Sequence, residues 1–190
     1  MKNLKVGVIV GSLRKGSFSM SIARAVMDFL PAAYEAQVLS IGNLPMFNQD
    51  YDGEGRPPAE WTDFRATVGE MDAYLFVTPE YNRSVPAVLK NALDIASRPY
   101  GQNMWRGKPG AIISVSPGKP GGFGANHHLR QSASCLNIHM LQQPEAYIGG
   151  VTDSLDENGR VIDPSLNDFL QSFAGSFGRW AERMAKPKEG

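Results

Sequence analysis

The sequence has little of three things: cysteine, net charge and long apolar runs. Its single cysteine, Cys135, excludes an intrachain disulfide and any metal site built from several cysteines. The 19 basic and 19 acidic residues leave no formal net charge, which gives no support to a general role in binding nucleic acid or anionic membranes. No apolar segment approaches the roughly 20 residues that a membrane-spanning helix needs, and the N-terminus shows no apolar signal region. We therefore expect a cytoplasmic protein with no nucleic-acid partner and no membrane insertion.

What is present is an ordinary globular composition, with 42% hydrophobic and 20% charged residues. At 190 residues the chain is long enough to bury a sizeable core. No linker or internal repeat divides it, so we expect residues 1–190 to form a single domain.

The stretch from Val6 to Ser19 is the most informative part of the chain. Residues 6–10 are typical of a buried strand, a loop rich in glycine, serine and basic residues follows, and a helical pattern begins at Ser19. A strand that enters a helix in this way directs backbone N–H groups, hydroxyls and an arginine to one point, at the positive end of the helix. The stretch therefore predicts a phosphate site.

Strand and helix patterns alternate along the rest of the chain. Strands are expected over residues 36–41, 73–78 and 110–115, and near 140–141 with Tyr147 as the furthest extent. Helices are expected over residues 19–30, 59–71, from Ser84 and Pro86 to 96, over 125–136, and from an Asp163–Pro164 start onward. This alternation implies an α/β fold with a five-stranded parallel sheet and helices on both faces.

Residues 43–58 contain too many helix and strand breakers to be regular. A loop this long in a compact domain is usually functional or mobile. Its apolar residues indicate packing against a ligand or a partner; they are Leu44, Met46, Phe47 and Tyr51.

The loops after the first, third and fourth strands have unusual compositions, and in a parallel α/β sheet they meet at the same edge. The first resembles a Walker loop in the spacing of Gly11 and Gly16, but Ser17 and Phe18 stand where lysine and a hydroxyl residue are required. A dinucleotide fingerprint fails at Leu13, where it needs a second glycine. A hydroxyl-rich loop with one arginine suits a terminal phosphomonoester. A solvated turn capped by serine is the alternative.

Three segments together resemble the NADPH-dependent FMN reductase family, and within it the bacterial chromate/quinone reductases. They are Gly11-Ser12-Leu13-Arg14-Lys15-Gly16-Ser17-Phe18-Ser19, Pro79-Glu80-Tyr81-Asn82-Arg83-Ser84-Val85-Pro86 and Leu89-Lys90-Asn91-Ala92-Leu93-Asp94. The match covers nearly the whole chain in the expected order. It implies a flavodoxin-like three-layer fold with sheet order 2-1-3-4-5, noncovalent FMN, NADPH or NADH as electron donor, and a homodimer or homotetramer.

Carried over by position, the resemblance assigns the FMN phosphate to the first loop and the flavin ring to the two later loops. The phosphate residues are Ser12, Arg14, Ser17, Phe18 and Ser19, although many relatives have asparagine where Ser19 stands. The ring residues are Pro79, Glu80, Tyr81 and Asn82, mostly through backbone groups, with Ser116 and Gly118 by the ring's other edge. No catalytic residue is assigned to the protein, because the flavin carries the hydride transfer.

Arg83 stands where some relatives carry tyrosine, at a position that neighbours a subunit interface in the family. Our hypothesis is that Arg83, Arg130 and Glu145 form a charged cluster at the subunit contact, close to the flavin. Three unrelated surface charges are the alternative.

The histidines do not predict a metal site. His127 and His128 are neighbours on an expected helix and point about 100° apart, so they cannot easily share an ion. Cys135 lies in an apolar helical segment and is expected to pack.

The resemblance implies an FMN-dependent NAD(P)H oxidoreductase that reduces quinones by two electrons in a ping-pong cycle. Chromate, other metal oxyanions or azo compounds would be opportunistic acceptors. The main alternative is a flavodoxin-type electron carrier without a small-molecule substrate, but such carriers are generally strongly acidic. A nucleotide-binding regulatory protein that never turns over also stays open.

Overall fold

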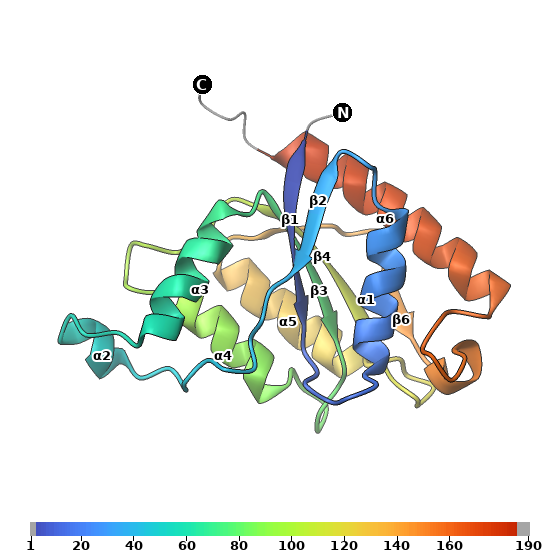
Figure 1. Cartoon of the computed structure of the whole chain (residues 1–190), viewed down its shortest axis with the longest axis horizontal. Coiled ribbons are helices and arrows are strands. Elements are labelled where there is room, and N and C mark those ends of the chain that lie inside the picture. The colour runs from blue at the N-terminus through green and yellow to red at the C-terminus, as the bar shows by residue number, and fades with distance from the viewer. Residues whose placement is uncertain (1–2, 186–190) are drawn as a thin grey trace.

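A parallel sheet forms the middle layer of the protein (Figure 1). The structure, a computed structural model, describes residues 3–185, so residues 1–2 and 186–190 of the expected domain lie outside the described residues. The strand order is β2-β1-β3-β4-β5, with β6 also paired to β4, and all of these pairings are parallel. The expected order 2-1-3-4-5 is therefore confirmed. The strands are β1 (Leu4–Val10), β2 (Tyr34–Val38), β3 (Ala73–Thr78), β4 (Pro109–Val115), β5 (His139–Met140) and β6 (Ala146–Ile148).

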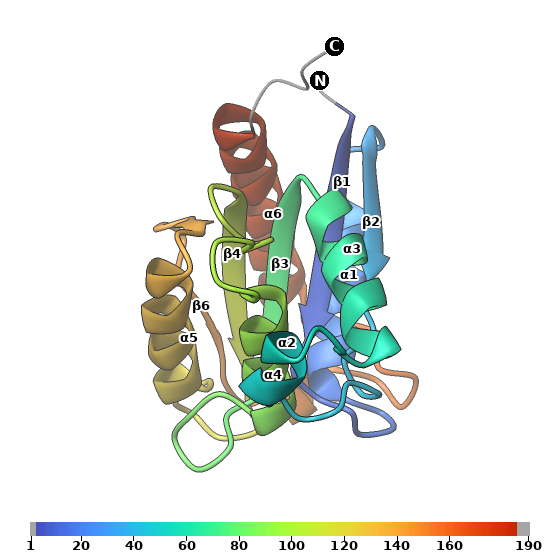
Figure 2. The same cartoon turned by 90° about the vertical axis from the view of Figure 1, so that its left-hand side faces the viewer.

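Helices cover both faces of this sheet, and Figure 2 shows α3 and α4 in front of the strands with α6 behind them. Within residues 3–185, no helix combines the length and the apolar character that crossing a membrane requires. The helices are α1 (Phe18–Phe29), α2 (Gln49–Gly53), α3 (Ala59–Glu70), α4 (Ala87–Ala96), α5 (Phe123–Cys135), the 3₁₀ turn η1 (Val151–Ser154) and α6 (Pro164–Met184).

Each face of the sheet has its own apolar cluster. Along β1, Val6, Val8 and Val10 pack with α1 and α6, whereas Ile9 packs with α3, α4 and α5. This is the two-residue period of a strand, and because both faces are buried the strand is almost continuously apolar in the sequence.

Two strands differ from the sequence prediction. β2 begins at Tyr34 instead of residue 36, and the Tyr34 hydroxyl donates a hydrogen bond of 2.9 Å to the carbonyl of Gly178 in α6. The expected fifth strand is two pieces, β5 and β6, so the sheet has six strands within the described residues. Pro144 lies between the pieces, and a proline has no N–H to donate to a neighbouring strand.

Two helix starts also differ. α4 begins at Ala87 with Pro86 before it and no side-chain cap, so the expected start at Ser84 is wrong. The Ser84 N–H instead donates to the carbonyl of Tyr81, in a turn outside the helix. α5 begins at Phe123 rather than 125, and Cys135 at its end is exposed rather than packed.

The 43–58 segment contains α2, so the expectation of an entirely irregular loop is wrong for these residues. The Asn48 side chain caps this short helix by accepting a hydrogen bond of 3.0 Å from the Asp50 N–H. Phe47 and Tyr51 contact Trp61 of α3, with ring centroids 5.3 and 5.8 Å apart. These apolar side chains of the loop therefore pack against this chain's own helix.

Two buried polar contacts fix this segment to α3 and α4. Arg65 and Asp52 form a two-pronged ion pair with both N–O distances at 2.8 Å, and their side chains are only 9% and 8% exposed. The Asn91 side chain accepts a hydrogen bond from the Phe47 N–H at 2.8 Å and donates to the Pro45 carbonyl at 3.1 Å. These two contacts join residues that are far apart in the sequence, and they hold the 43–58 segment against α3 and α4.

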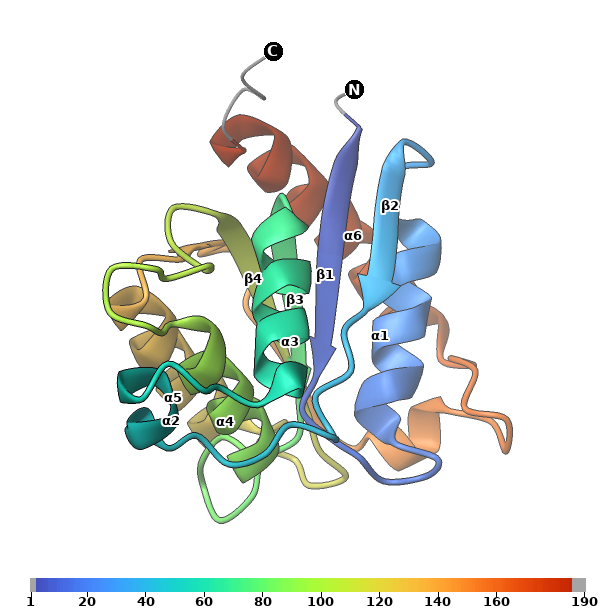
Figure 3. The same ribbon diagram turned by 60° about the vertical axis from the view of Figure 1, so that its left-hand side comes forward.

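Because every strand runs the same way, the carboxyl ends of the strands lie at one edge of the sheet, the lower edge in Figure 3. The loops that follow β1, β3 and β4 come together there, and α1, α4 and α5 begin there. This is the edge at which folds of this type bind ligands.

The buried ion pair yields a stability prediction. Asp52→Ala should lower the free energy of unfolding by about 3–5 kcal/mol, because it leaves the Arg65 guanidinium buried without its counter-charge. Urea unfolding measures this loss. The control Glu54→Ala breaks the Glu54–Arg56 pair, whose side chains are 56% and 78% exposed, and should cost about 1 kcal/mol or less. Equal losses in the two variants would contradict the prediction.

Candidate functional site at the carboxyl edge of the sheet

The loop between β1 and α1 presents hydrogen-bond donors that have no acceptor of their own. Ser17 caps α1, and its side-chain oxygen accepts a hydrogen bond of 3.3 Å from the Met20 N–H. The amides of Phe18 and Ser19 in the first turn have no hydrogen-bond partner within residues 3–185. The Ser19 hydroxyl, on a residue that is 2% exposed, has none there either. Unpaired amides and an unpaired hydroxyl at a helix start favour an anion.

Arg14 lies beside this helix start. Its guanidinium stands 4.8 Å from the ring centroid of Phe18 and donates a hydrogen bond of 3.4 Å to the Lys15 carbonyl. The Ser12 side-chain oxygen accepts from the Arg14 N–H at 3.4 Å. Gly16 has a φ of +65°, a left-handed conformation that few other residues adopt readily. The loop thus folds back so that Ser12, Arg14 and Ser17 adjoin the first turn of α1.

The loop after β3 is a tight turn with two left-handed residues. Tyr81 and Ser84 exchange backbone hydrogen bonds of 3.1 and 3.0 Å, and the residues between them, Asn82 and Arg83, have φ of +50° and +66°. Left-handed φ at both central positions is the pattern of a type I′ turn, which usually contains glycine. Residues other than glycine in this conformation are held by their surroundings and often occur at functional sites. The Tyr81 side chain, 51% exposed, stands out from this turn.

Glu80 holds this turn against the start of α5. Its carboxylate accepts a hydrogen bond of 3.1 Å from the Ala125 N–H and pairs with Arg83 at 3.4 Å. A Cβ atom at Gly124 would come within 2.7 Å of the Arg83 carbonyl oxygen, so the close approach requires glycine there. The side chain of Glu80 therefore fixes the turn, a role beyond the backbone contacts that the resemblance implies.

The loop after β4 lies against the end of β6. The Ser116 N–H donates to the Ile148 carbonyl at 2.9 Å, and the Ser116 side chain accepts from the Gly118 N–H at 3.0 Å. A Cβ atom at Gly121, whose φ is +62°, would come within 2.6 Å of the Tyr147 backbone. Ser116 and Gly118 thus form a narrow backbone turn at the same edge of the sheet as the turn after β3.

The predicted charged residues have separate partners in one chain. Arg83 pairs with Glu80, whereas Arg130 donates to the Asn126 side chain at 3.0 Å and to the Leu141 carbonyl at 3.1 Å. Glu145 is exposed and lies near Tyr147, and burial, followed by a hydrogen bond from the Tyr147 hydroxyl to Glu145, raises the pKa of Tyr147. The cluster that we expect concerns a contact between subunits and stays a prediction.

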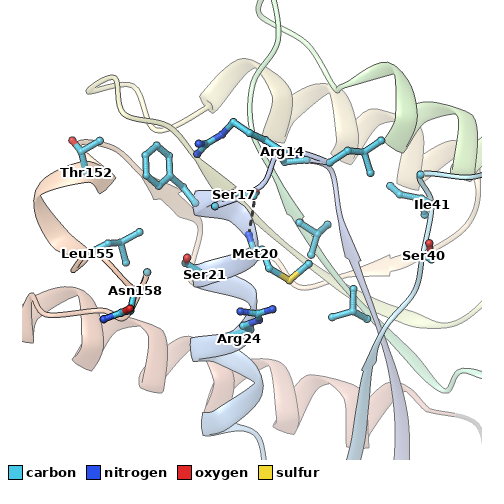
Figure 4. Close-up of a pocket in the computed structure, with 18 of the residues that line it drawn as sticks. Arg14, Ser17, Met20, Ser21, Arg24, Ser40, Ile41, Thr152, Leu155 and Asn158 are labelled. Carbon is cyan, nitrogen blue, oxygen red and sulfur yellow. Dashed lines mark hydrogen bonds between the residues drawn. The ribbon is translucent and has the colours of Figure 1, made fainter.

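A cavity of about 650 Å³ adjoins the first loop (Figure 4). Four of the predicted phosphate residues line it: Ser12, Arg14, Ser17 and Phe18. The predicted ring residues of the β3 and β4 loops do not line it. The cavity extends from the first loop along α1, between residues 38–42 and residues 152–159.

Residues 3–185 contain no group of three or more His, Cys, Asp or Glu side chains placed to hold a metal ion. His127 shares a hydrogen bond of 3.0 Å with the Tyr147 hydroxyl, and His128 shares one of 2.9 Å with the Ser84 hydroxyl. The two neighbouring histidines therefore serve different contacts.

The chain as a whole matches a known family. A model of the NADPH-dependent FMN reductase family matches residues 4–153, so the chain belongs to that family. Among individual proteins, it is 49% identical to a quinone reductase of Pseudomonas putida, over 93% of this chain and 94% of that protein. It is 43% identical to a 2-hydroxy-1,4-benzoquinone reductase of Burkholderia sp., over 93% of this chain and 96% of that protein. The solved structure of a flavoenzyme NAD(P)H:(acceptor) oxidoreductase from Paracoccus denitrificans superposes with a TM-score of 0.89 at 37% identity, covering 96% of this chain and 100% of that one.

Sequence reasoning missed several residues that shape this edge. The side-chain role of Glu80 depends on Ala125, and the role of Asn91 depends on the backbone of residues 44–47; neither contact leaves a local pattern. The 152–159 segment was not expected near the first loop. A usable signal was Gly124 directly after Phe123, because a glycine in the first turn of a helix often permits close backbone approach.

The contact between Glu80 and α5 can be tested by hydrogen exchange. Glu80→Ala should speed exchange of the Ala125, Tyr81 and Ser84 amides, because the turn loses its side-chain tie to the helix. The control Arg83→Ala removes only the partner whose side chain is 81% exposed and should leave these amides nearly unchanged. Exchange no faster in Glu80→Ala than in the control would show that the turn is held by its backbone alone.

Proposed function

We propose that this protein is an FMN-dependent NAD(P)H oxidoreductase that reduces quinones by two electrons in a ping-pong cycle. The observation that carries the proposal is the set of unpaired donors at the start of α1, at the same sheet edge as the β3 and β4 turns. The family membership and the two quinone-reducing relatives support the same conclusion.

The residues at this edge fit FMN. The phosphate would be held by Ser12, Arg14, Ser17, Ser19 and the first-turn amides, with Phe18 at the helix start. A phosphate has several oxygens that accept hydrogen bonds, and hydroxyl groups together with a guanidinium supply the donors that they need. The ring would lie against Pro79, Glu80, Tyr81 and Asn82, with Ser116 and Gly118 at its other edge.

When bound, FMN supplies the hydride chemistry, so the chain's own task is to hold and shield it. Within the turn only the Tyr81 and Ser84 amides donate hydrogen bonds, so the Asn82 and Arg83 amides have no acceptor among residues 3–185 and could donate to a ligand. Glu80 keeps this turn in place through α5. The exposed rings of Tyr81 and Phe123 offer apolar area beside the turns, which helps to exclude water from a flat ligand.

Several finer points belong to the same proposal. Chromate, other metal oxyanions and azo compounds would be opportunistic acceptors, and NADPH or NADH would be the donor. We further propose one cytoplasmic domain that forms a homodimer or homotetramer, with Arg83, Arg130 and Glu145 clustered at the subunit contact. The exposure of Arg83 and Glu145 leaves both side chains accessible to a second copy.

The main alternative is an electron carrier that binds FMN without a small-molecule substrate. The zero net charge is unlike the strongly acidic surface that attracts basic redox partners. The decisive test adds a quinone to the FMN-loaded protein with NADPH and, separately, NADH. We expect consumption of the nicotinamide that depends on the quinone. A yellow, flavin-loaded protein without such consumption would indicate the carrier.

The phosphate assignment predicts the effect of one substitution. Arg14→Ala should weaken FMN binding roughly 10- to 150-fold, because it removes a charge-assisted contact worth about 1.5–3 kcal/mol. Quenching of flavin fluorescence measures the affinity. The control Lys15→Ala removes the neighbouring exposed cation, which salt screens, and should have little effect. Unchanged affinity in Arg14→Ala would place the phosphate elsewhere.

A further inference from the structure

Three aromatic side chains gather at the start of α5, where Phe123 is 53% exposed. The ring centroids of Phe123 and His127 lie 4.1 Å apart, and those of Phe123 and Tyr147 lie 5.3 Å apart. The rings of His127 and Tyr147 are stacked with 18° between their planes, and His127 Nε2 shares a hydrogen bond of 3.0 Å with the Tyr147 hydroxyl. Because Phe123 and His127 are both exposed, the cluster is not part of the apolar core.

The backbone around this aromatic cluster contacts both turns that would hold the flavin ring. On one side, the Ala125 N–H in the first turn of α5 donates a hydrogen bond of 3.1 Å to Glu80 of the β3 turn. On the other side, Gly121 of the β4 loop packs against the backbone of Tyr147. The start of α5 and the loops after β3 and β4 lie together at the lower edge in Figure 3. The cluster therefore adjoins the place where a quinone would meet the flavin.

The reduction of a quinone needs a proton as well as a hydride. A quinone that takes up a hydride becomes a hydroquinone monoanion, and a proton on its second oxygen completes the two-electron reduction. A side chain that is charged and acidic near neutral pH can deliver this proton as a general acid. Histidine is the residue whose ordinary change of charge falls between about pH 5 and 8.

The other polar side chains at this edge do not suit this task. The Glu80 carboxylate is paired with Arg83 and accepts a backbone hydrogen bond from α5. An exposed lysine, an arginine or a phenol such as Tyr81 keeps its proton at neutral pH. His128 contacts Ser84, and both line a separate cavity of about 400 Å³ between α4 and α5. Of the described side chains at this edge, the histidine of the aromatic cluster remains as the donor.

Tyr147 determines how the hydrogens of His127 are arranged. Burial, followed by a hydrogen bond from the Tyr147 hydroxyl to Glu145, raises the pKa of Tyr147, whereas the charge of Arg130 lowers it. With its own hydrogen directed to Glu145, the Tyr147 oxygen accepts a hydrogen bond from Nε2–H of His127. Nδ1 of His127 then has no partner among residues 3–185 and is the ring nitrogen that can exchange a proton with a ligand.

We propose that His127 is the proton donor for quinone reduction and that Tyr147 positions it. Nδ1–H of the His127 imidazolium protonates the oxygen of the hydroquinone monoanion, which leaves a neutral imidazole with its hydrogen on Nε2. Water returns the proton to Nδ1 before the next cycle. This inference rests on the proposed function, because it assigns one residue a part in the reduction of the quinone.

The test follows the two half-reactions of the FMN-loaded protein separately by stopped flow. In His127→Gln, reduction by NADPH should proceed at the wild-type rate, because this step takes no proton from the chain. Reoxidation by a dimethoxybenzoquinone should slow about 100-fold. Reoxidation by a dichlorobenzoquinone should slow less, because its hydroquinone anion is more stable. In wild-type protein the rate of reoxidation should fall as the pH rises and the imidazolium is lost, and His127→Gln should lack this fall.

The neighbouring histidine provides a matched control. His128→Gln changes the next residue of the same helix, whose ring contacts Ser84, and should leave both half-reactions and the pH profile unchanged. Tyr147→Phe keeps an aromatic ring and removes the hydroxyl, so it should slow reoxidation less than His127→Gln does and keep the pH dependence. In the FMN-free protein, NMR of the ring nitrogens should place the hydrogen of neutral His127 on Nε2, and Tyr147→Phe should remove this preference.

The outcomes separate this proposal from the function on which it rests. Unchanged reoxidation in His127→Gln, equal slowing of its two half-reactions, or equal slowing in the two histidine variants overturns the role of His127. A hydrogen on Nδ1 of neutral His127 in the FMN-free protein overturns it as well. Wild-type protein that NADPH does not reduce, or that a quinone does not reoxidise, would instead overturn the proposed function.

Discussion

The parallel pairing of β1 with β3 is the constraint on which the site depends. The pairing continues past the last residue of β1, where the Gly11 N–H donates to the Val77 carbonyl at 2.9 Å. A Cβ atom at Gly11 would come within 2.8 Å of the Thr78 hydroxyl, so any larger residue there would have to displace the Thr78 side chain. This register places the first loop directly beside the loop after β3. A shift of the register would separate the unpaired donors of α1 from the Asn82–Arg83 turn.

Around this pairing, a few polar side chains hold loops that have no core of their own. Glu80 ties the β3 turn to α5, Asn91 ties the 44–47 backbone to α4, and the Arg65–Asp52 pair ties α2 to α3. Each contact joins a loop to a helix that starts or ends at the site edge. Rigid elements that position loops are the usual way in which α/β folds build binding sites. The three contacts together give this edge a defined shape before any ligand binds.

Local sequence patterns predicted those features whose causes are local. The strand Ala73–Thr78 agrees to the residue, because its apolar run is bounded by Asp72 and Pro79. The start of α6 agrees too, since the Asp163 side chain accepts from the Ser165 N–H at 2.8 Å, as an N-cap should. The sequence pattern predicted one strand where the structure has β5 and β6, although Pro144 is a local signal for a break between them. The contacts of Glu80 and Asn91 with distant backbone could not be predicted from residue spacing, because the local sequence does not indicate which backbone group each side chain will contact.

The loop between β1 and α1 borders different surroundings on its two sides. Toward β3 and β4, the loop faces turns made of backbone and exposed rings, which suit a flat ring without supplying charge. Toward the 152–159 segment, it borders the cavity that runs along α1 as far as Arg24. The unpaired donors at the start of α1 therefore lie between the turns that would hold a flat ring and the cavity along α1.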